Sequence, residues 1–303
     1  MKKLGCFFIV ILLFITGCTK NEYESTNGGD FGIGSDFWLK MGDGSIVSTS
    51  DIDFYDVSTH MIYLKKKLPY LENMGLYGGA MSVYVDDVEI YTCSFHSLLL
   101  SSLPEGAYIS CVPSFYPEDI IRINFAQFIN SNHEPQFTDH RSDKRIIAAL
   151  KKNHQYHEGL HCEIQSVHVS NGKLGLNIEL SNQDTYHYYY LDPNKMGIGL
   201  FHYFTNGLYL WNDAFTKNFT HQETVIHPEP WDSWKKEWLS LIRSGERKKI
   251  SITYQHFDAI PSGKYKMYFE FPGLSHVSQK DRKLGNGRIW MGSIGTEKEI
   301  AIQ

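Results

Sequence analysis

The chain has 303 residues, of which 34 are acidic and 29 are Lys or Arg, so the formal net charge is −5. With 42% apolar and 21% charged residues, its composition is that of a globular protein and excludes a largely disordered chain. The acidic balance and the lack of a large Lys/Arg cluster exclude a typical nucleic-acid-binding domain, and we expect no nucleic-acid partner.

The N-terminal segment is the most informative stretch of the sequence. Two lysines follow Met1, and the stretch from Leu4 to Ile15 is almost wholly apolar. A membrane-spanning helix needs roughly 20 apolar residues. This shorter run after a basic start is therefore typical of a secretory signal peptide.

The end of this segment, Ile15-Thr16-Gly17-Cys18, resembles the lipobox of bacterial lipoproteins. The resemblance implies that residues 1–17 are removed as a signal peptide and that Cys18 becomes the first residue and carries acyl chains such as palmitate. Each buried lipid methylene contributes about 0.8 kcal/mol and one chain binds only marginally, so several chains would provide the membrane anchor. The alternative is that Cys18 is an ordinary thiol after an uncleaved anchor.

The same resemblance implies a location in the cell envelope, lipid-anchored in the outer membrane of a Gram-negative bacterium. Residues 18–35 are polar, rich in glycine and without periodicity, which predicts a flexible tether. Lys20 followed by Glu22 and Glu24 resembles a surface-export signal of some such lipoproteins. An ordinary solvated tether is the alternative.

Residues 36–165 are expected to form an α+β domain. Short apolar or alternating runs predict strands at 59–65, 107–112 and 121–125, and a hairpin at 82–91 with Asp86-Asp87 as its turn. A helix is predicted after Asp143, which can cap it, because Ile146 and Leu150 have helical spacing.

Residues 166–303 are expected to form a mainly β domain. Asn171-Gly172 predicts a two-residue hairpin turn, and the residues from Leu174 to Leu180 then alternate between apolar and polar. Further strands are predicted at 162–169, 186–191, 199–204, 207–211, 250–254, 265–271, 288–292 and 299–302. This density of short strands is typical of a β-sandwich.

Two motifs in this second segment resemble immunoglobulin-like sandwiches. Ser244-Gly245-Glu246 precedes an alternating run, and Ile260–Tyr265 (IPSGKY) resembles a tyrosine corner, in which the Tyr hydroxyl bonds back to the backbone. The resemblance to small bacterial immunoglobulin-like domains, including proteinase-inhibitor-like sandwiches, covers about residues 173–272 and implies an antiparallel sandwich. One inserted helix is predicted from Pro230, with an apolar stripe that includes Trp231, Trp234 and Trp238.

Cysteine and histidine residues suggest two further kinds of site. The exported location permits disulfides, and Cys93 with Cys111 is the expected pair because they lie on neighbouring predicted strands. His154, His157 and His161 form a candidate metal site, since imidazole is a common ligand. The alternative is structural packing, because the first two continue the apolar stripe of the preceding helix.

Exposed aromatic residues could bind a ligand. Trp231, at the start of its predicted helix, and Trp211 with Tyr209, near a strand end, are the candidate ligand-binding residues. Packing in the core is the alternative, because the tryptophans from 231 to 238 have the spacing of a helix face.

The sequence contains no GxSxG motif, P-loop or dinucleotide-binding glycine motif in a suitable context. We therefore expect a non-catalytic binding or assembly role at the envelope, with no cofactor and with a protein or glycan as partner. The alternative is an envelope hydrolase, metal-dependent if the histidines converge, with its site in the N-terminal domain.

Overall fold

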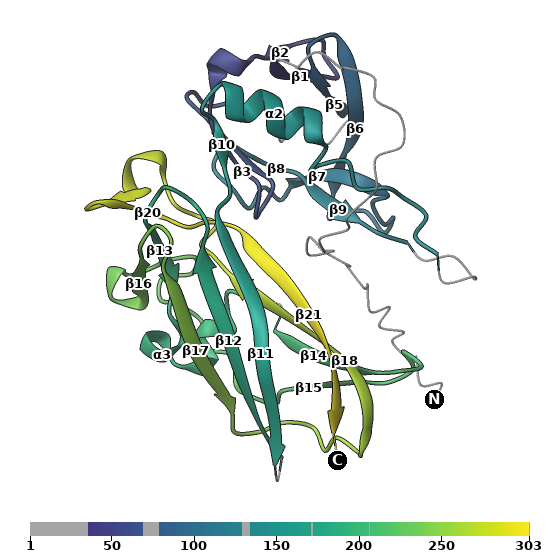
Figure 1. The fold of residues 1–303 in the computed structure, drawn as a ribbon, viewed down its shortest axis with the longest axis vertical. Coiled ribbons are helices and arrows are strands. Elements are labelled where there is room, and N and C mark those ends of the chain that lie inside the picture. Colours follow the sequence, from purple (N-terminus) through teal and green to yellow (C-terminus); the bar gives the residue numbers. More distant parts are fainter. Residues whose placement is uncertain (1–35, 69–78, 129–133, 171, 206, 303) are drawn as a thin grey trace, which may run out of the picture.

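The computed structural model describes residues 36–302 except 69–78, 129–133, 171 and 206. The expected signal peptide, Cys18 and the tether lie outside the described residues. Strands account for 49% and helices for 10% of the structure, so the protein is mainly β. Figure 1 shows two parts stacked along the long axis, which we call the first half (residues 36–159) and the second half (residues 160–302).

The first half contains a six-stranded and a four-stranded sheet, with strand orders β2-β1-β5-β6-β7-β9 and β10-β3-β4-β8. Their strands are β1 (Phe37–Met41), β2 (Ile46–Val47), β3 (Ile52–Asp56), β4 (Met61–Leu64), β5 (Ala80–Val85), β6 (Val88–Ser97), β7 (Gly106–Val112), β8 (Ile120–Arg122), β9 (Asn124–Ala126) and β10 (Tyr156–His157). The predicted strands of this segment are present: β4 is shorter than predicted, β5, β6 and β7 are longer, and the stretch predicted as one strand at 121–125 forms the two short strands β8 and β9.

The predicted helix is confirmed as α2 (Lys144–Lys152), and the Asp143 carboxylate caps it by accepting a hydrogen bond from the Arg145 amide. Its buried face, which includes Ile146 and Leu150, shares one apolar core with strands of both sheets. Figure 1 shows the helix lying across the six-stranded sheet. Hydrophobic burial of this stripe holds the helix against the sheet.

The second half contains three sheets with the orders β11-β12-β17, β16-β13-β20-β19 and β15-β14-β18-β21. Their strands are β11 (Leu160–Ser170), β12 (Lys173–Asn182), β13 (Tyr188–Leu191), β14 (Leu208–Asn212), β15 (Asn218–Thr220), β16 (Leu239–Ile242), β17 (Arg247–Tyr254), β18 (Gly263–Pro272), β19 (Lys283–Leu284), β20 (Gly287–Ile289) and β21 (Ser293–Ile302). Because β11 is continuous past residue 165, the expected boundary between the domains falls inside a strand.

One apolar core lies between the β11-β12-β17 sheet and the β15-β14-β18-β21 sheet. Leu176 and Ile252 come from the first of these sheets, and Leu210 and Met267 come from the second. The predicted hairpin is confirmed, since Ser170 pairs with Lys173 across the turn. The alternation of apolar and polar residues along these strands therefore gives each sheet one buried and one solvated face.

The predicted tyrosine-corner hydrogen bond is present at the start of β18. The Tyr265 hydroxyl donates to the Pro261 carbonyl oxygen at 2.7 Å. This contact fastens the loop that enters β18 to the strand itself.

Two predictions for the second half are wrong. Instead of the inserted helix from Pro230, the chain forms a short 3-10 turn (Lys236–Trp238) and then β16, which pairs antiparallel with β13. Instead of a strand at 199–204, two short helices form, α3 (Pro193–Met196) and α4 (Ile198–Phe201). Local apolar spacing is ambiguous in both stretches, and pairing with a distant strand decides the structure of β16.

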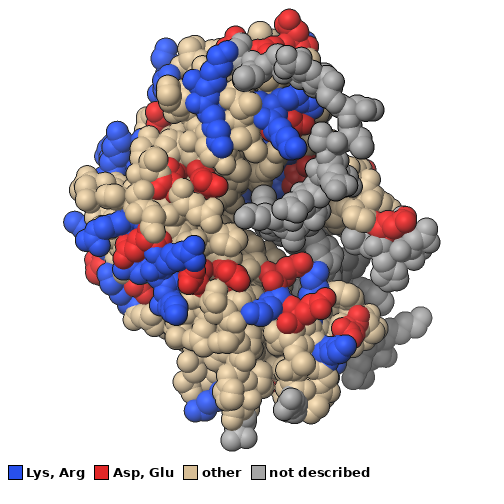
Figure 2. Space-filling view, viewed as in Figure 1, with Lys and Arg blue, Asp and Glu red and all other residues tan. Residues whose placement is uncertain are grey.

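Among the described residues, no helix has the length and apolar character needed to cross a membrane. Figure 2 shows positive and negative side chains interspersed over one face of the molecule.

Candidate ligand-binding cleft

A cavity of about 600 Å³ lies between the two halves, and residues of both halves line it. We call it the cleft. The first half contributes residues of β7, β8, β9 and the loop between β7 and β8, and the second half contributes residues near α4, the end of β18 and the start of β21. Ligand pockets in proteins commonly have volumes of roughly 300–1,000 Å³ and lie between domains.

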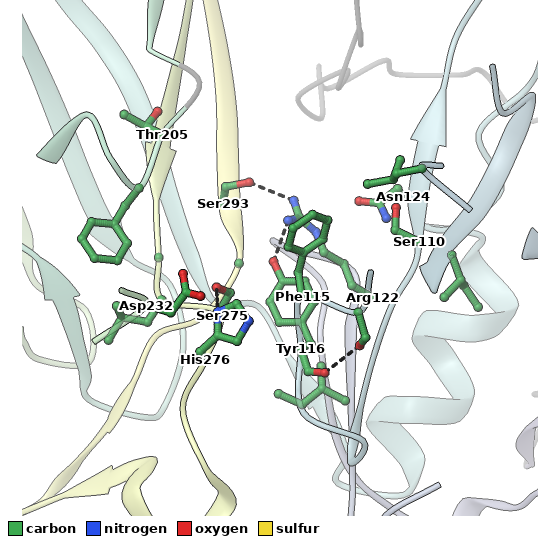
Figure 3. Close-up of a pocket in the computed structure, with 18 of the residues that line it drawn as sticks. Ser110, Phe115, Tyr116, Arg122, Asn124, Thr205, Asp232, Ser275, His276 and Ser293 are labelled. Carbon is green, nitrogen blue, oxygen red and sulfur yellow. Dashed lines mark hydrogen bonds between the residues drawn. The ribbon is translucent and has the colours of Figure 1, made fainter. Parts of the chain in front are cut away.

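Arg122 is the only Lys or Arg among the described residues that line the cleft. It lies at the end of β8, after the buried residues Ile120 and Ile121. Its guanidinium donates hydrogen bonds to the Tyr116 hydroxyl at 2.7 Å and to the Ser293 hydroxyl at 2.9 Å. Figure 3 shows it between the two walls, directed toward Ser293 of the second half.

The wall from the second half carries the acidic groups. The Tyr203 hydroxyl donates to the Asp232 carboxylate at 2.7 Å, and Glu270 of β18 also lines the cleft. Burial and this hydrogen bond to Asp232 raise the pKa of Tyr203. The Ser275 hydroxyl and Nδ1 of His276 are 2.9 Å apart at the same wall, and Figure 3 shows both on the side of Asp232.

The charges of the two walls are therefore separated. Among the described lining residues, the first half supplies Arg122 and no Asp, Glu or His, whereas the second half supplies Asp232, Glu270 and His276 and no Lys or Arg. Burial lowers the pKa of Arg122, but Tyr116 and Glu270 raise it, and the net shift is upward. The guanidinium therefore remains charged inside the cleft.

A buried interface fixes the two walls relative to each other. Phe54 and Met61 of the first half share an apolar cluster with Leu274 and Ile289 of the second half. At the same interface, the guanidinium of Arg288 in the second half lies over the ring of Phe54 in the first half, 4.5 Å from its centroid. Burial of this apolar surface favours a single relative placement of the halves.

None of the predicted aromatic ligand-binding residues lines the cleft. Trp231 is 64% exposed and lies beside it, edge-to-face with Tyr203 and stacked on His227. Tyr209 and Trp211 lie on the outer face of β14, where Trp211 packs against Phe215. The structure therefore places only Trp231 next to the cleft.

The three candidate metal-binding histidines are not brought together. His157 is buried and its Nδ1 lies 2.7 Å from the Asp184 carboxylate, whereas His154 and His161 are exposed. No group of three or more His, Cys, Asp or Glu side chains among the described residues is arranged to hold a metal ion. His157 and Asp184 instead belong to a buried polar network that includes the Tyr188 hydroxyl.

The predicted disulfide is wrong, because Cys93, Cys111 and Cys162 are all free and buried. Strands β6 and β7 are parallel, and Ser94 pairs with Tyr108. Cys93 is thus level with residue 107, and Cys111 lies four residues further along the neighbouring strand, about 13 Å away. A disulfide requires Cα atoms within about 7 Å.

Four residues of the cleft were not predicted from the sequence: Arg122, Tyr116, Asp232 and Glu270. The available signal was a single guanidinium within the apolar stretch Ile120–Phe125, since an arginine in such a stretch needs polar partners. The acidic wall had no comparable signal, because its residues come from distant parts of the chain.

No protein-family model matches the sequence, and a search of curated proteins finds no match. The function must therefore be argued from the geometry of the cleft.

Proposed function

We propose that this protein is a lipid-anchored, non-catalytic binding protein of the bacterial cell envelope that holds a saccharide in the cleft. The observation that carries the proposal is the cleft itself, which combines aromatic rings with many hydrogen-bonding side chains on two fixed walls. The lipobox-like sequence ending at Cys18 supports the location, with the lipid on Cys18 as the membrane anchor.

Saccharides present apolar C–H faces and a high density of hydroxyl groups. A site for them needs aromatic surfaces together with side chains that both donate and accept hydrogen bonds. The aromatic residues Tyr108, Phe115, Tyr116, Tyr203 and Phe204 line the cleft. Hydroxyl and amide groups come from Ser110, Asn124, Thr205, Ser275 and Ser293.

The geometry gives little support to the hydrolase alternative. The wall from the first half carries no acid or imidazole among its described residues. His276 contacts Ser275 through Nδ1, but no ion pair orients that imidazole among the described residues, as a nucleophile–base arrangement requires. His157, which is paired with Asp184, is buried outside the cleft.

We also infer that the second half is an immunoglobulin-like sandwich that serves as a rigid support for its wall. The apolar core shared by two sheets and the hydrogen bond from Tyr265 to Pro261 support this interpretation. Two residues of the wall, Glu270 of β18 and Ser293 of β21, lie on its strands, and strands hold side chains more precisely than loops.

A protein partner is the second candidate, because exposed leucines lie at the edge of the cleft. Leu99 and Leu100 are 76% and 60% exposed, and their neighbour Leu98 lines the cleft. Exposed apolar groups of this kind often mark protein interfaces.

A glycan array tests the proposal. The wild-type protein is expected to retain a defined set of glycans, and Ser275→Trp, which fills the cleft, is expected to abolish retention. Ser278→Trp is the control, because Ser278 is exposed three residues further along the same loop and does not line the cleft. Failure to bind any glycan, together with capture of an envelope protein that Leu99→Asp abolishes, would instead favour the protein partner.

A further inference from the structure

We propose that the saccharide in the cleft is part of a longer chain, and that a further unit of this chain stacks on the indole ring of Trp231. The inference rests on the proposed function and adds a second binding position outside the cleft, together with a minimum length for the ligand. It is carried by the exposure of Trp231 and by the contacts that place its ring at the edge of the cleft.

A tight turn holds Trp231 away from the core. The Ser233 amide donates a hydrogen bond to the Pro230 carbonyl oxygen at 3.1 Å, which makes Trp231 one of the two central residues of the turn. The other is Asp232, whose φ of 60° is a left-handed conformation that aspartate adopts more readily than most residues. Its carboxylate accepts the hydrogen bond from the Tyr203 hydroxyl at 2.7 Å. The turn is therefore fastened to the wall of the cleft, with Trp231 at its tip.

One face of the indole ring is supported and the other is open. The His227 ring stacks on the indole, with the ring centroids 4.5 Å and the planes 24° apart. Tyr203 meets both rings edge-to-face, with its centroid 5.4 Å from that of His227 and 5.9 Å from that of Trp231. Trp231 is nevertheless 64% exposed, so the face away from His227 is open to solvent. The indole therefore forms a fixed aromatic platform.

The platform is continuous with the cleft. Tyr203 lines the cleft and also contacts the indole, and Asp232, which follows Trp231 in the chain, lines the cleft as well. A saccharide chain that leaves the cleft on this side passes Tyr203 and then reaches Trp231. Occupying both positions requires at least two sugar units.

A pyranose ring matches the platform in shape and chemistry. Its C–H groups form an apolar face that can pack on the indole, while its equatorial hydroxyls point outward and remain in water. Stacking removes apolar surface from water on both sides, and the gain is not offset by burying hydroxyl groups without partners. An open tryptophan beside a polar cleft therefore suits a sugar chain whose units present such faces in succession.

Calorimetric titration with oligomers of increasing length tests this inference. The probes are β-1,4-linked oligomers of glucose, N-acetylglucosamine and mannose, each from one to six units. In at least one series, the affinity is expected to rise about tenfold at the length that first reaches Trp231, which is the gain typical of one added aromatic contact. Trp231→Ala should remove this rise, and Trp231→Phe, which keeps a smaller ring, should retain part of it.

Trp211→Ala is the matched control, because Trp211 lies on the outer face of β14 and does not line the cleft. It should preserve the rise in affinity with chain length. Binding that Ser275→Trp abolishes, but that is equally tight at every length or keeps its rise in Trp231→Ala, would overturn the inference and leave saccharide binding in the cleft intact. No binding of these oligomers or of any glycan on the array would overturn both proposals.

Discussion

The guanidinium of Arg282 donates two hydrogen bonds, each 2.7 Å long, to the carboxylate of Asp119, 163 positions earlier in the chain. Asp119 is 1% exposed and immediately precedes β8, and Arg282 lies between the 3-10 turn Gln279–Asp281 and β19. This ion pair therefore joins the two halves and holds β8, which carries Arg122, against the second half.

Breaking this pair should strongly destabilise the protein. Asp119→Ala leaves a buried guanidinium without its partner, and such a change typically costs about 3–5 kcal/mol in the free energy of unfolding. Glu118→Ala is the control, because its pair with Lys67 is exposed on both sides and is expected to contribute about 0–1 kcal/mol. Urea unfolding measures both, and similar losses for the two variants would contradict the assigned role of the buried pair.

Gly159→Ala should be much more costly than Gly245→Ala. Both glycines have positive φ, +73° and +71°, which an alanine adopts only with strain. A Cβ at Gly159 would also collide with Ser58 Oγ and lie 2.5 Å from the Asp56 carboxylate, whereas a Cβ at Gly245 would meet nothing within 4 Å. We expect Gly159→Ala to lower the free energy of unfolding by about 1–3 kcal/mol more than Gly245→Ala does. Urea unfolding measures both variants, and equal losses would show that the added methyl group is not crowded at Gly159.

Acid should destabilise the second half through His202. This side chain is buried and stacks on His221 at 3.9 Å, and neither of its ring nitrogens has a hydrogen-bond partner among the described residues. Burial, and then the neighbouring His221, lower the pKa of His202 from 6.5 to about 3. The unfolded state therefore binds more protons between these values, and stability falls as the pH falls through this range.

The expected contribution of His202 at about pH 5 is a loss of about 2 kcal/mol relative to pH 7.5. His202→Phe should remove most of that loss, because a phenyl ring keeps the stacking on His221 and Tyr254 and cannot be protonated. His161→Phe, at an exposed position of β11, should leave the loss unchanged. If His202→Phe lost as much stability on acidification as the wild type, His202 would not be the responsible group.

The thiols of Cys93, Cys111 and Cys162 should be inert in the folded protein. All three are buried, and burial raises the pKa of each thiol, which disfavours the reactive thiolate. We expect no alkylation of these thiols by iodoacetamide without denaturant and no change of Tm with a reducing agent. Mass spectrometry checks the alkylation, and a Tm that falls on reduction would indicate a disulfide.

The sequence predicts the helices, strands and turns of this protein better than it predicts which strands pair with one another. The helix after Asp143 and the hairpin around residues 171–172 were predictable, because capping, helical spacing and turn chemistry act within a few residues. The stretch Leu239–Ile242 has the local spacing of the helix predicted from Pro230, and that prediction is wrong. Its structure depends on pairing with β13, which local spacing does not reveal. Arg122 and Glu270 line the same cleft for the same long-range reason.

Hydroxyl-radical footprinting with a saccharide identified on the glycan array tests the central claim most directly. Phe115 lines the cleft and is 42% exposed, and Phe215 lies outside it with a matching 44% exposure. Because equal rings at equal exposure should be oxidised at similar rates, the pair controls for intrinsic reactivity. We expect the saccharide to protect Phe115 and to leave Phe215 unchanged, whereas binding that leaves Phe115 unprotected would contradict a saccharide site in the cleft.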